Sequence, residues 1–207
     1  IRGHHEDKNI NEKYGLGDEC TERLGDDITN PLSIFANINK AFDYLPFGVL
    51  VDNNILIIHG GIGSSINSLE DIENIKRPVS VEHNVTSTAQ LNIIDLLWSE
   101  YSDNIDNIEV NNERDKNKNG FIVKYGKERL NKFLADNKIN LLITAHQFVK
   151  EGFTTFNNDR LLTVFSATNY MDKYKNVGGM ITIAKKRANK RMNIIPKLIN
   201  MSNEKKN

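Results

Sequence analysis

The sequence has little of the features that mark disulfide-rich, membrane-spanning or strongly charged proteins. It contains one cysteine, Cys20, in 207 residues, which excludes an internal disulfide framework and is typical of a reducing compartment. Lys and Arg together number 27, as do Asp and Glu, so zero net charge gives no electrostatic reason to expect nucleic acid or an anionic membrane as partner. No apolar run approaches membrane-spanning length. We therefore expect a cytoplasmic or nuclear location, or both.

The composition that is present predicts a globular fold. Hydrophobic residues make up 39% and charged residues 26% of the chain, and 207 residues can bury a sizeable core. The chain opens on Ile1-Arg2-Gly3, which reads as the end of a strand with no initiator Met, so we expect a fragment of a longer protein. We assign residues 1–200 to one partial domain and residues 201–207 to a loose polar tail.

Hydrophobic periodicity predicts helices early in the chain and strands late. The predicted helices span 6–24 (broken near Gly15 and Gly17), 31–45 (with Pro31 in its first turn and Asn30 as cap), 68–75, 90–98 and 127–137. The predicted strands span 47–51 and 55–59 as a hairpin, then 141–145, 152–156, 161–166, 180–184 and 194–199. Residues 103–119 are expected to form a long polar loop. This order indicates an α/β or α+β domain with a layered sheet core.

Histidines at the ends of predicted strands are the first candidates for chemistry. His59 follows the run 55–58 and precedes two glycines, and His146 follows the run 141–145. His4 and His5 come directly after the strand end at the start of the chain. Neutral imidazole binds first-row metals well, and strand exits present ligands from a rigid scaffold. One such histidine is better explained as structural, but three favour a metal site. His83 has no such setting and is expected to be a solvated loop residue.

Several motifs, in order, resemble those of a known family. Arg2-Gly3-His4-His5-Glu6 resembles the Arg-Gly-Asn-His-Glu signature of the PPP family of Ser/Thr protein phosphatases. Further matches follow in the family's order: Tyr14-Gly15, Asp18-Glu19-Cys20, Leu45-Pro46, His59-Gly60-Gly61, Arg77-Pro78, Asp95-Leu96-Leu97-Trp98-Ser99, Ala145-His146-Gln147 and Phe165-Ser166-Ala167-Thr168-Asn169-Tyr170. The resemblance covers residues 1–199. It implies an α/β fold with a metallophosphoesterase-type β-sandwich flanked by helices, with the N-terminal strands missing.

A subgroup is also suggested. Thr168 stands where most relatives have proline, as in the phosphatases that carry N-terminal kelch repeats, and further segments are similar to that subgroup: Arg23-Leu24-Gly25, Ile62-Gly63-Ser64, residues 122–126 and residues 196–199. The resemblance then implies a β-propeller upstream of this chain.

The resemblance implies hydrolysis of phosphoserine or phosphothreonine in a two-metal site. Two divalent ions (Mn, or Fe and Zn) would activate a water that attacks phosphorus directly. His59 and His146 match two histidine ligands of the second ion, and His4 occupies the place of an asparagine ligand. His5 matches the general acid that protonates the leaving oxygen. The implied partners are a phosphoprotein substrate and possible regulatory subunits.

Two further positions match substrate-binding residues of the family. Arg114 best matches the arginine that holds the substrate phosphate, for which a guanidinium fork is suited. Tyr170 matches the tyrosine that lines the catalytic cleft. Trp98 and Phe165 are expected in the core rather than the site. Residue Cys20 is expected to be a small buried apolar side chain, and Arg2 to fray at the chain end.

The chain also departs from the family pattern. His4 replaces asparagine, Thr144 replaces arginine and Met171 replaces cysteine. The Asp-x-His and Asp-x-x-Asp-Arg motifs, which would supply the first ion's ligands, would lie upstream of Ile1, so the chain alone is expected to lack a complete site and to leave a sheet edge unpaired. Two alternatives stay open: a catalytically impaired binding module marked by His4, and, less favoured, another metallophosphoesterase such as a nuclease.

Overall fold

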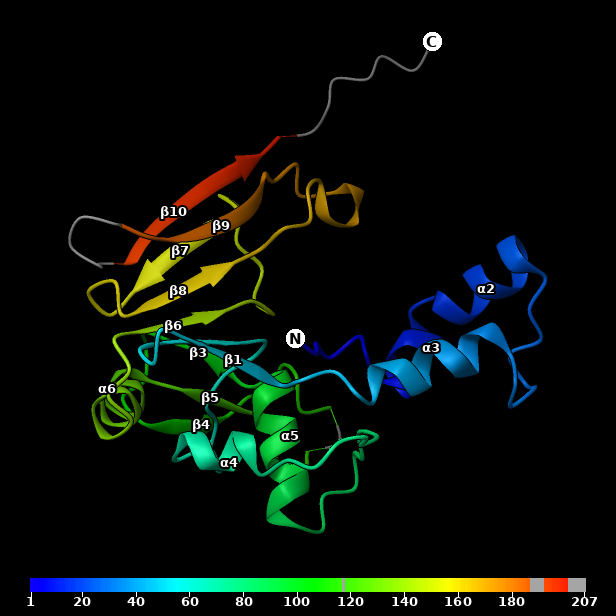
Figure 1. Ribbon diagram of the computed structural model, residues 1–207, viewed down its shortest axis with the longest axis horizontal. Helices are drawn as coiled ribbons and strands as arrows, with labels where there is room; N and C mark the ends of the chain where they lie inside the picture. The colour runs from blue at the N-terminus through cyan, green and yellow to red at the C-terminus, as the bar shows by residue number, and fades with distance from the viewer. Residues whose placement is uncertain (117, 187–191, 201–207) are drawn as a thin grey trace.

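The computed structural model describes residues 1–116, 118–186 and 192–200 (Figure 1). The predicted tail at 201–207 lies outside the described residues. Within the described part, three sheets are packed with helices, and a group of N-terminal helices stands to one side. The mixed α/β class predicted from the sequence is confirmed, and none of the described helices has the length and hydropathy needed to cross a membrane.

The five-stranded sheet has the order β1-β2-β6-β8-β7. Its strands are β1 (Gly48–Val51), β2 (Ile55–Ile58), β6 (Leu141–Thr144), β8 (Leu161–Val164) and β7 (Phe153–Phe156). The central strands β2, β6 and β8 run parallel, and the outer pairs are antiparallel. Asp52 and Asn53 adopt positive φ angles of 51° and 56° in the turn between β1 and β2, the conformation that a tight hairpin turn requires. The predicted hairpin is therefore confirmed.

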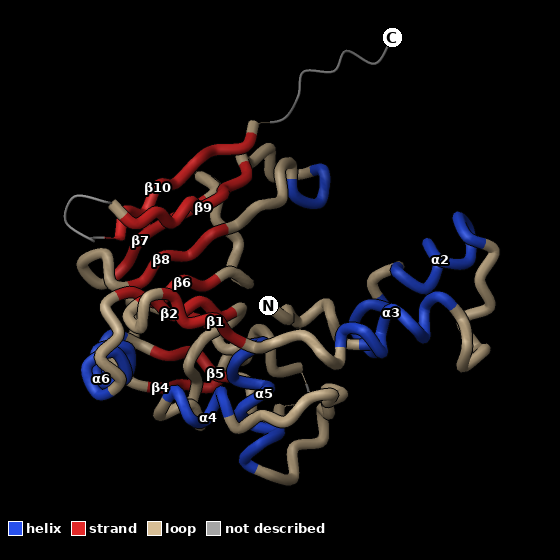
Figure 2. Tube along the Cα trace, viewed as in Figure 1, coloured by secondary structure: helices blue, strands red, loops and turns tan. Residues whose placement is uncertain are grey.

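The long hairpin of β9 (Gly178–Lys185) and β10 (Met192–Ile199) forms a second sheet beside β7 and β8 (Figure 2). Its apolar side chains pack on a small cluster at the centre of the five-stranded sheet: Ile181, Ile183, Met192 and Ile194 against Ile55, Ile143 and Leu162. The other face of the five-stranded sheet packs on the main core, where α6 (Lys127–Asp136) and α5 (Thr88–Trp98) bury Leu130, Phe133, Leu96 and Leu97. Helix α4 (Leu69–Glu73) borders this core.

A third sheet, in the order β3-β5-β4, was not predicted. It consists of β3 (Glu100–Tyr101), β5 (Val123–Tyr125) and β4 (Ile108–Val110). Two of these strands have three residues and one has two, so none is long enough to give a period-two pattern. The prediction of an uninterrupted loop over 103–119 is wrong at β4, which is exposed but hydrogen-bonded to β5.

The N-terminal helices α1 (Lys8–Lys13), α2 (Leu16–Leu24) and α3 (Ile34–Phe42) pack together beside the sheets. The predicted break falls at Gly15, whose φ of +99° favours glycine. Helix α3 begins after Ser33, whose hydroxyl accepts a hydrogen bond from the Ala36 amide, so the predicted start at Pro31 with an Asn30 cap is wrong. The buried Cys20 has the role that we predicted.

Arg2 is fully buried, and the expectation that it frays is wrong. Its side chain is 2% exposed, and its guanidinium pairs with the Asp43 carboxylate at 3.0 Å. It also donates hydrogen bonds to the carbonyls of Val79 and Glu6. A guanidinium has five N–H donors in a fixed geometry, so it can hydrogen-bond to several chain segments at once. These bonds hold the segment that carries His4 and His5 in place.

Candidate metal centre and active site

Three histidines from distant parts of the chain meet at one edge of the five-stranded sheet. The Nδ1 atom of His4 lies 2.7 Å from Nε2 of His59 and 3.1 Å from Nδ1 of His146. One ring nitrogen from each side chain lies within 4.8 Å of the other two. We call these three residues the histidine cluster. The cluster that the sequence predicted is therefore assembled in the structure.

Sheet topology explains this convergence. Strands β2 and β6 are parallel neighbours, so His59 and His146, which follow them, leave the sheet at the same edge. The Ala145 amide donates to the His59 carbonyl, which extends the pairing as far as the cluster. His146 has a φ of +62°, a left-handed conformation that is uncommon for a non-glycine residue. The fold thus holds the His146 backbone in a costly conformation at a position where its ring meets His4.

Glycine at position 60 lets the β2 exit approach helix α5 closely. Its amide donates to the Leu96 carbonyl at 2.7 Å. A Cβ atom at this position would lie 2.8 Å from the carbonyl carbon of Leu97, closer than real Cβ contacts come. Any side chain there would push the His59 exit away from the end of α5, where Trp98 stands.

Trp98 forms one wall of the histidine cluster. Its ring centroid lies 4.7 Å from that of His4 and 5.6 Å from that of His146. The side chain also packs on the main core, so the expectation of a core residue is right but incomplete. The indole shields the cluster from water on this side.

Burial keeps the clustered rings neutral. Desolvation is the main cause that lowers the pKa of His4 to about 3, of His59 to about 4 and of His146 to about 2. Repulsion from neighbouring imidazoles and from the positive charge of Arg114 lowers the pKa of His4 and His146 further, whereas for His59 the additional lowering comes from His5 and the N-terminal amine. At neutral pH each ring therefore has a lone pair to offer to a cation.

The donor set fits a divalent metal ion. A tetrahedral ion with metal–nitrogen bonds of about 2.0–2.1 Å separates its ligand nitrogens by about 3.3 Å, close to the contacts seen here. The Nε2 atom of His146 is buried without a hydrogen-bond partner, although Oε1 of Glu100 lies 3.4 Å away in poor alignment. A ligand bond at Nδ1 would place the His146 proton on Nε2, facing that carboxylate, an arrangement that often supports metal-binding histidines.

Glu100 is a site residue that the sequence did not single out. Its carboxylate accepts hydrogen bonds from Arg114 Nε and from the buried amide of Asn111, both at 2.9 Å. It therefore joins the cluster to the loop that carries Arg114. Sequence reasoning could have selected Glu100 from its position directly after the family-like motif that ends in Trp98-Ser99.

His5 and Arg114 stand at the rim. The His5 ring is exposed, with its centroid 4.4 Å from that of His4 and 5.2 Å from that of Tyr14, and it is outside the ligand set. The Arg114 side chain is 39% exposed and paired with Glu100. Arg114, Trp98 and Tyr14 line one cavity of about 300 Å³. The structure thus brings both predicted residues beside the histidine cluster.

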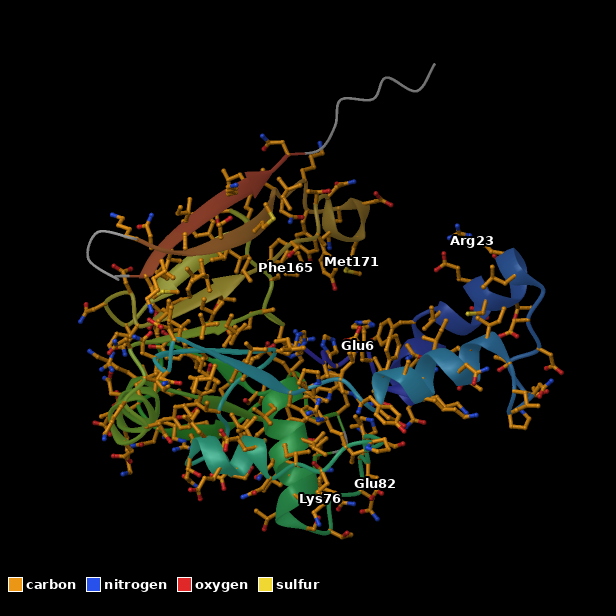
Figure 3. The ribbon with its side chains drawn as sticks, viewed as in Figure 1. Glu6, Arg23, Lys76, Glu82, Phe165 and Met171 are labelled. Carbon is orange, nitrogen blue, oxygen red and sulfur yellow. The ribbon has the colours of Figure 1, made fainter. Side chains whose placement is uncertain are left out.

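Tyr170 lies in an aromatic group on the loop after β8. Its ring packs edge-on against Phe165 at 5.1 Å, and Phe148 contacts both rings. Phe148 is two residues past His146, which puts this group next to the β6 exit. Figure 3 shows Phe165 and Met171 on this loop, with Glu6 on the N-terminal segment below them. Phe165, expected in the core, is partly buried in this surface group.

His83 differs from the solvated residue that we predicted. Its Nε2 lies 2.6 Å from Oδ2 of Asp7, whose side chain is 2% exposed. The hydrogen bond to Asp7 raises the pKa of His83 and outweighs the lowering by burial. Asp7 also caps helix α1 by accepting from the Asn9 amide. A composition-based reading of a polar stretch could not find this pair, because the two residues are 76 positions apart.

Comparison with known proteins agrees with this geometry. A sequence model of the calcineurin-like phosphoesterase family matches residues 1–150. The chain belongs to this family. It is 35% identical over 199 residues to the serine/threonine-protein phosphatase BSL2 of Arabidopsis thaliana. It is also similar in structure to a Saccharomyces cerevisiae protein serine/threonine phosphatase that resembles human phosphatase PP5, with a TM-score of 0.74 and 25% sequence identity.

These alignments cover nearly all of this chain but only part of its relatives. The match to the Arabidopsis protein spans 96% of this chain and 18% of that protein, and the match to the yeast structure spans 99% and 61% respectively. The resemblance to Ser/Thr phosphatases and the phosphatase fold are thereby confirmed. The family implies divalent metal ions, which agrees with the donor set of the histidine cluster.

Proposed function

We propose that this chain is part of a metal-dependent Ser/Thr protein phosphatase that hydrolyses phosphoserine and phosphothreonine in proteins. The observation that carries the proposal is the convergence of three neutral imidazoles, with His5 and Arg114 at their rim. Phosphoryl transfer needs positioning and charge stabilisation more than covalent chemistry, and these groups supply both. The relatives named above are phosphatases, which supports the same reaction class.

Each residue has a defined task in this reaction. His4, His59 and His146 would hold a divalent ion, which would supply the Lewis acidity that lowers the pKa of a bound water. The protonated His5 ring donates its proton to the leaving serine or threonine oxygen, and its exposure at the rim leaves room for a peptide. Arg114 directs its free guanidinium nitrogens to phosphate oxygens while Glu100 holds its Nε.

Neighbouring groups complete the proposed site. The Trp98 wall excludes water from the reacting centre, which strengthens charge interactions there. We propose that the aromatic group around Tyr170 lines the substrate side of this site. We further propose two ions (Mn, or Fe and Zn), membership of the kelch-repeat subgroup, regulatory subunits as partners, and a location in cytoplasm, nucleus or both. The alternative of a nuclease is disfavoured because the zero net charge gives no electrostatic reason to expect nucleic acid as substrate.

The experiment is hydrolysis of a phosphoserine peptide by the full-length protein in the presence of Mn²⁺. His5→Ala and His4→Asn are compared with His83→Ala, which removes an imidazole outside the histidine cluster. Activity that is lost in His5→Ala and kept in His83→Ala supports the proposal. A second candidate is a catalytically impaired binding module, favoured by imidazole at position 4 where the phosphatase signature has asparagine. No activity in the unmodified protein but activity in His4→Asn would put the binding module first.

A further inference from the structure

The cavity of about 300 Å³ beside the histidine cluster has an apolar floor. The side chains that form this floor belong to the main core or pack against it: Ile94, Val85, Phe121, Ile122 and Trp98. Because close-packed side chains have little freedom to move, the core holds the floor of the cavity in shape. The volume is at the lower end of the range of ligand pockets, about 300–1,000 Å³.

The rim of this cavity carries charged side chains that are unequally paired. Glu113 faces Lys124 at 3.6 Å, and Asp115 is buried with its carboxylate accepting a hydrogen bond from a backbone amide. Lys13 and Lys116 also line the cavity and are exposed. Among the residues that the structure describes, neither of these two ammonium groups is paired with a carboxylate. The rim therefore presents positive charge to a group that enters the cavity.

The position of the cavity links it to the reacting centre of the proposed function. Trp98 and Tyr14 line the cavity and also contact rings of the site. The ring centroid of Trp98 lies 4.7 Å from that of His4, and the centroid of Tyr14 lies 5.2 Å from that of His5. An extended peptide advances about 3.3–3.6 Å per residue. A peptide whose phosphoserine is held at the site can therefore place a nearby side chain in the cavity.

We propose that the cavity binds an acidic substrate residue, with a side chain like that of glutamate, within about three residues of the phosphoserine. The methylene groups of this side chain pack on the apolar floor, and its carboxylate meets Lys13 and Lys116 at the rim. The two lysines determine specificity and take no part in the chemical step. The inference rests on the proposed function, because a phosphopeptide must bind beside the histidine cluster.

The test measures binding, so that it does not depend on turnover. Fluorescent peptides carry a non-hydrolysable phosphonate mimic of phosphoserine and one glutamate, which is placed in turn at each position within the proposed range. Matched peptides carry glutamine instead. The full-length protein should bind the preferred glutamate peptide at least about threefold more tightly than its glutamine counterpart at low salt. Added salt should reduce this difference, because it screens charges at an exposed rim.

The variant that decides the matter combines Lys13→Glu with Lys116→Glu. Two negative charges in place of two positive ones should remove the preference for glutamate or reverse it. The matched control is Lys8→Glu, which makes the same charge change on helix α1, at a side chain that lines a different cavity. This control should keep the preference of the unmodified protein.

Equal affinity for glutamate and glutamine peptides at every position, or no measurable binding of either, overturns the inference. An equal loss of preference in Lys8→Glu and in the double variant overturns it as well. Hydrolysis of the corresponding phosphoserine peptides separates the inference from the proposed function. A glutamate preference that depends on Lys13 and Lys116, without hydrolysis, would overturn only the proposed function. Hydrolysis without such a preference would overturn only the inference.

Discussion

The histidine cluster and the His83–Asp7 pair place the same kind of side chain in opposite surroundings. In the cluster, imidazole meets imidazole under the Trp98 ring, and desolvation lowers the pKa of His146 to about 2. In the pair, imidazole meets a buried carboxylate, and the hydrogen bond to it raises the pKa of His83. Burial lowers the pKa of the cluster rings, whereas for His83 the hydrogen bond to a carboxylate outweighs burial and raises the pKa.

The difference assigns two roles to one residue type. Neutral rings with free lone pairs can bind a metal ion, whereas a ring whose pKa is raised by a carboxylate can hold that carboxylate through a hydrogen bond. The His83–Asp7 pair also has a structural role, because Asp7 caps helix α1 directly after the segment with His4 and His5. Substitutions in the two regions should therefore affect different properties of the protein.

The largest expected effect comes from His146→Ala. Removing a ligand of the ion withdraws several kcal/mol of transition-state stabilisation, so kcat/KM for a phosphoserine peptide should fall by at least about a thousandfold. The matched variant His83→Ala should retain activity. Comparable losses in both variants would mean that the two regions do not differ in the way described.

A smaller loss is expected for His5→Ala, which leaves the ligand set intact. Removal of a general acid should lower kcat by about 10²–10⁴-fold. Substrates with a good leaving group, such as an aryl phosphate, need less protonation and should lose much less. An equal loss on both substrates would argue against the role of proton donor.

Arg114→Lys should have a moderate effect. Lysine keeps the positive charge but not the fork that holds Glu100 and phosphate together, so kcat/KM should fall by about ten- to a hundredfold. Inorganic phosphate, as a product inhibitor, should bind more weakly by a similar factor. Unchanged inhibition by phosphate would place Arg114 outside the phosphate site.

The smallest effect concerns stability at the His83–Asp7 pair. The pKa of folded His83 is raised, so its stabilising contribution is fully present below the unfolded value of about 6.5 and is lost as pH rises through the folded value. Because the His83 side chain is 34% exposed, we discount the pair to about 1 kcal/mol. Urea unfolding should show His83→Gln less stable than the unmodified protein at about pH 6, with a smaller gap at about pH 9. A difference in unfolding free energy between the two proteins that does not change with pH would contradict this role of the His83–Asp7 hydrogen bond.

The sequence predicted what local pattern encodes. Apolar runs predicted strands β2 and β6. The histidines that follow these strands predicted the cluster, because parallel neighbouring strands end at the same edge of the sheet. The sequence did not predict features that depend on contacts between residues far apart along the chain. Neither the burial of Arg2 nor the bond of His83 to Asp7 has a signature within a short window.

Short elements and caps were also beyond sequence pattern alone. Strands β3, β4 and β5 have two or three residues and are defined by pairing rather than by periodicity. Ser33 and Asn30 are both good caps by type, and the structure uses Ser33 at the start of α3. Glu100 and Trp98 acquire their place at the site only when the end of α5 meets the exit of β2.

The most direct test of the central claim is a histidine-ring NMR titration of the full-length protein with Zn²⁺ at neutral pH. The account expects the ring signals of His4, His59 and His146 to change together as the ion binds. The signals of His83 should stay in place, because its ring is held by Asp7. A titration in which the three cluster rings do not respond, or in which His83 responds with them, would contradict the account.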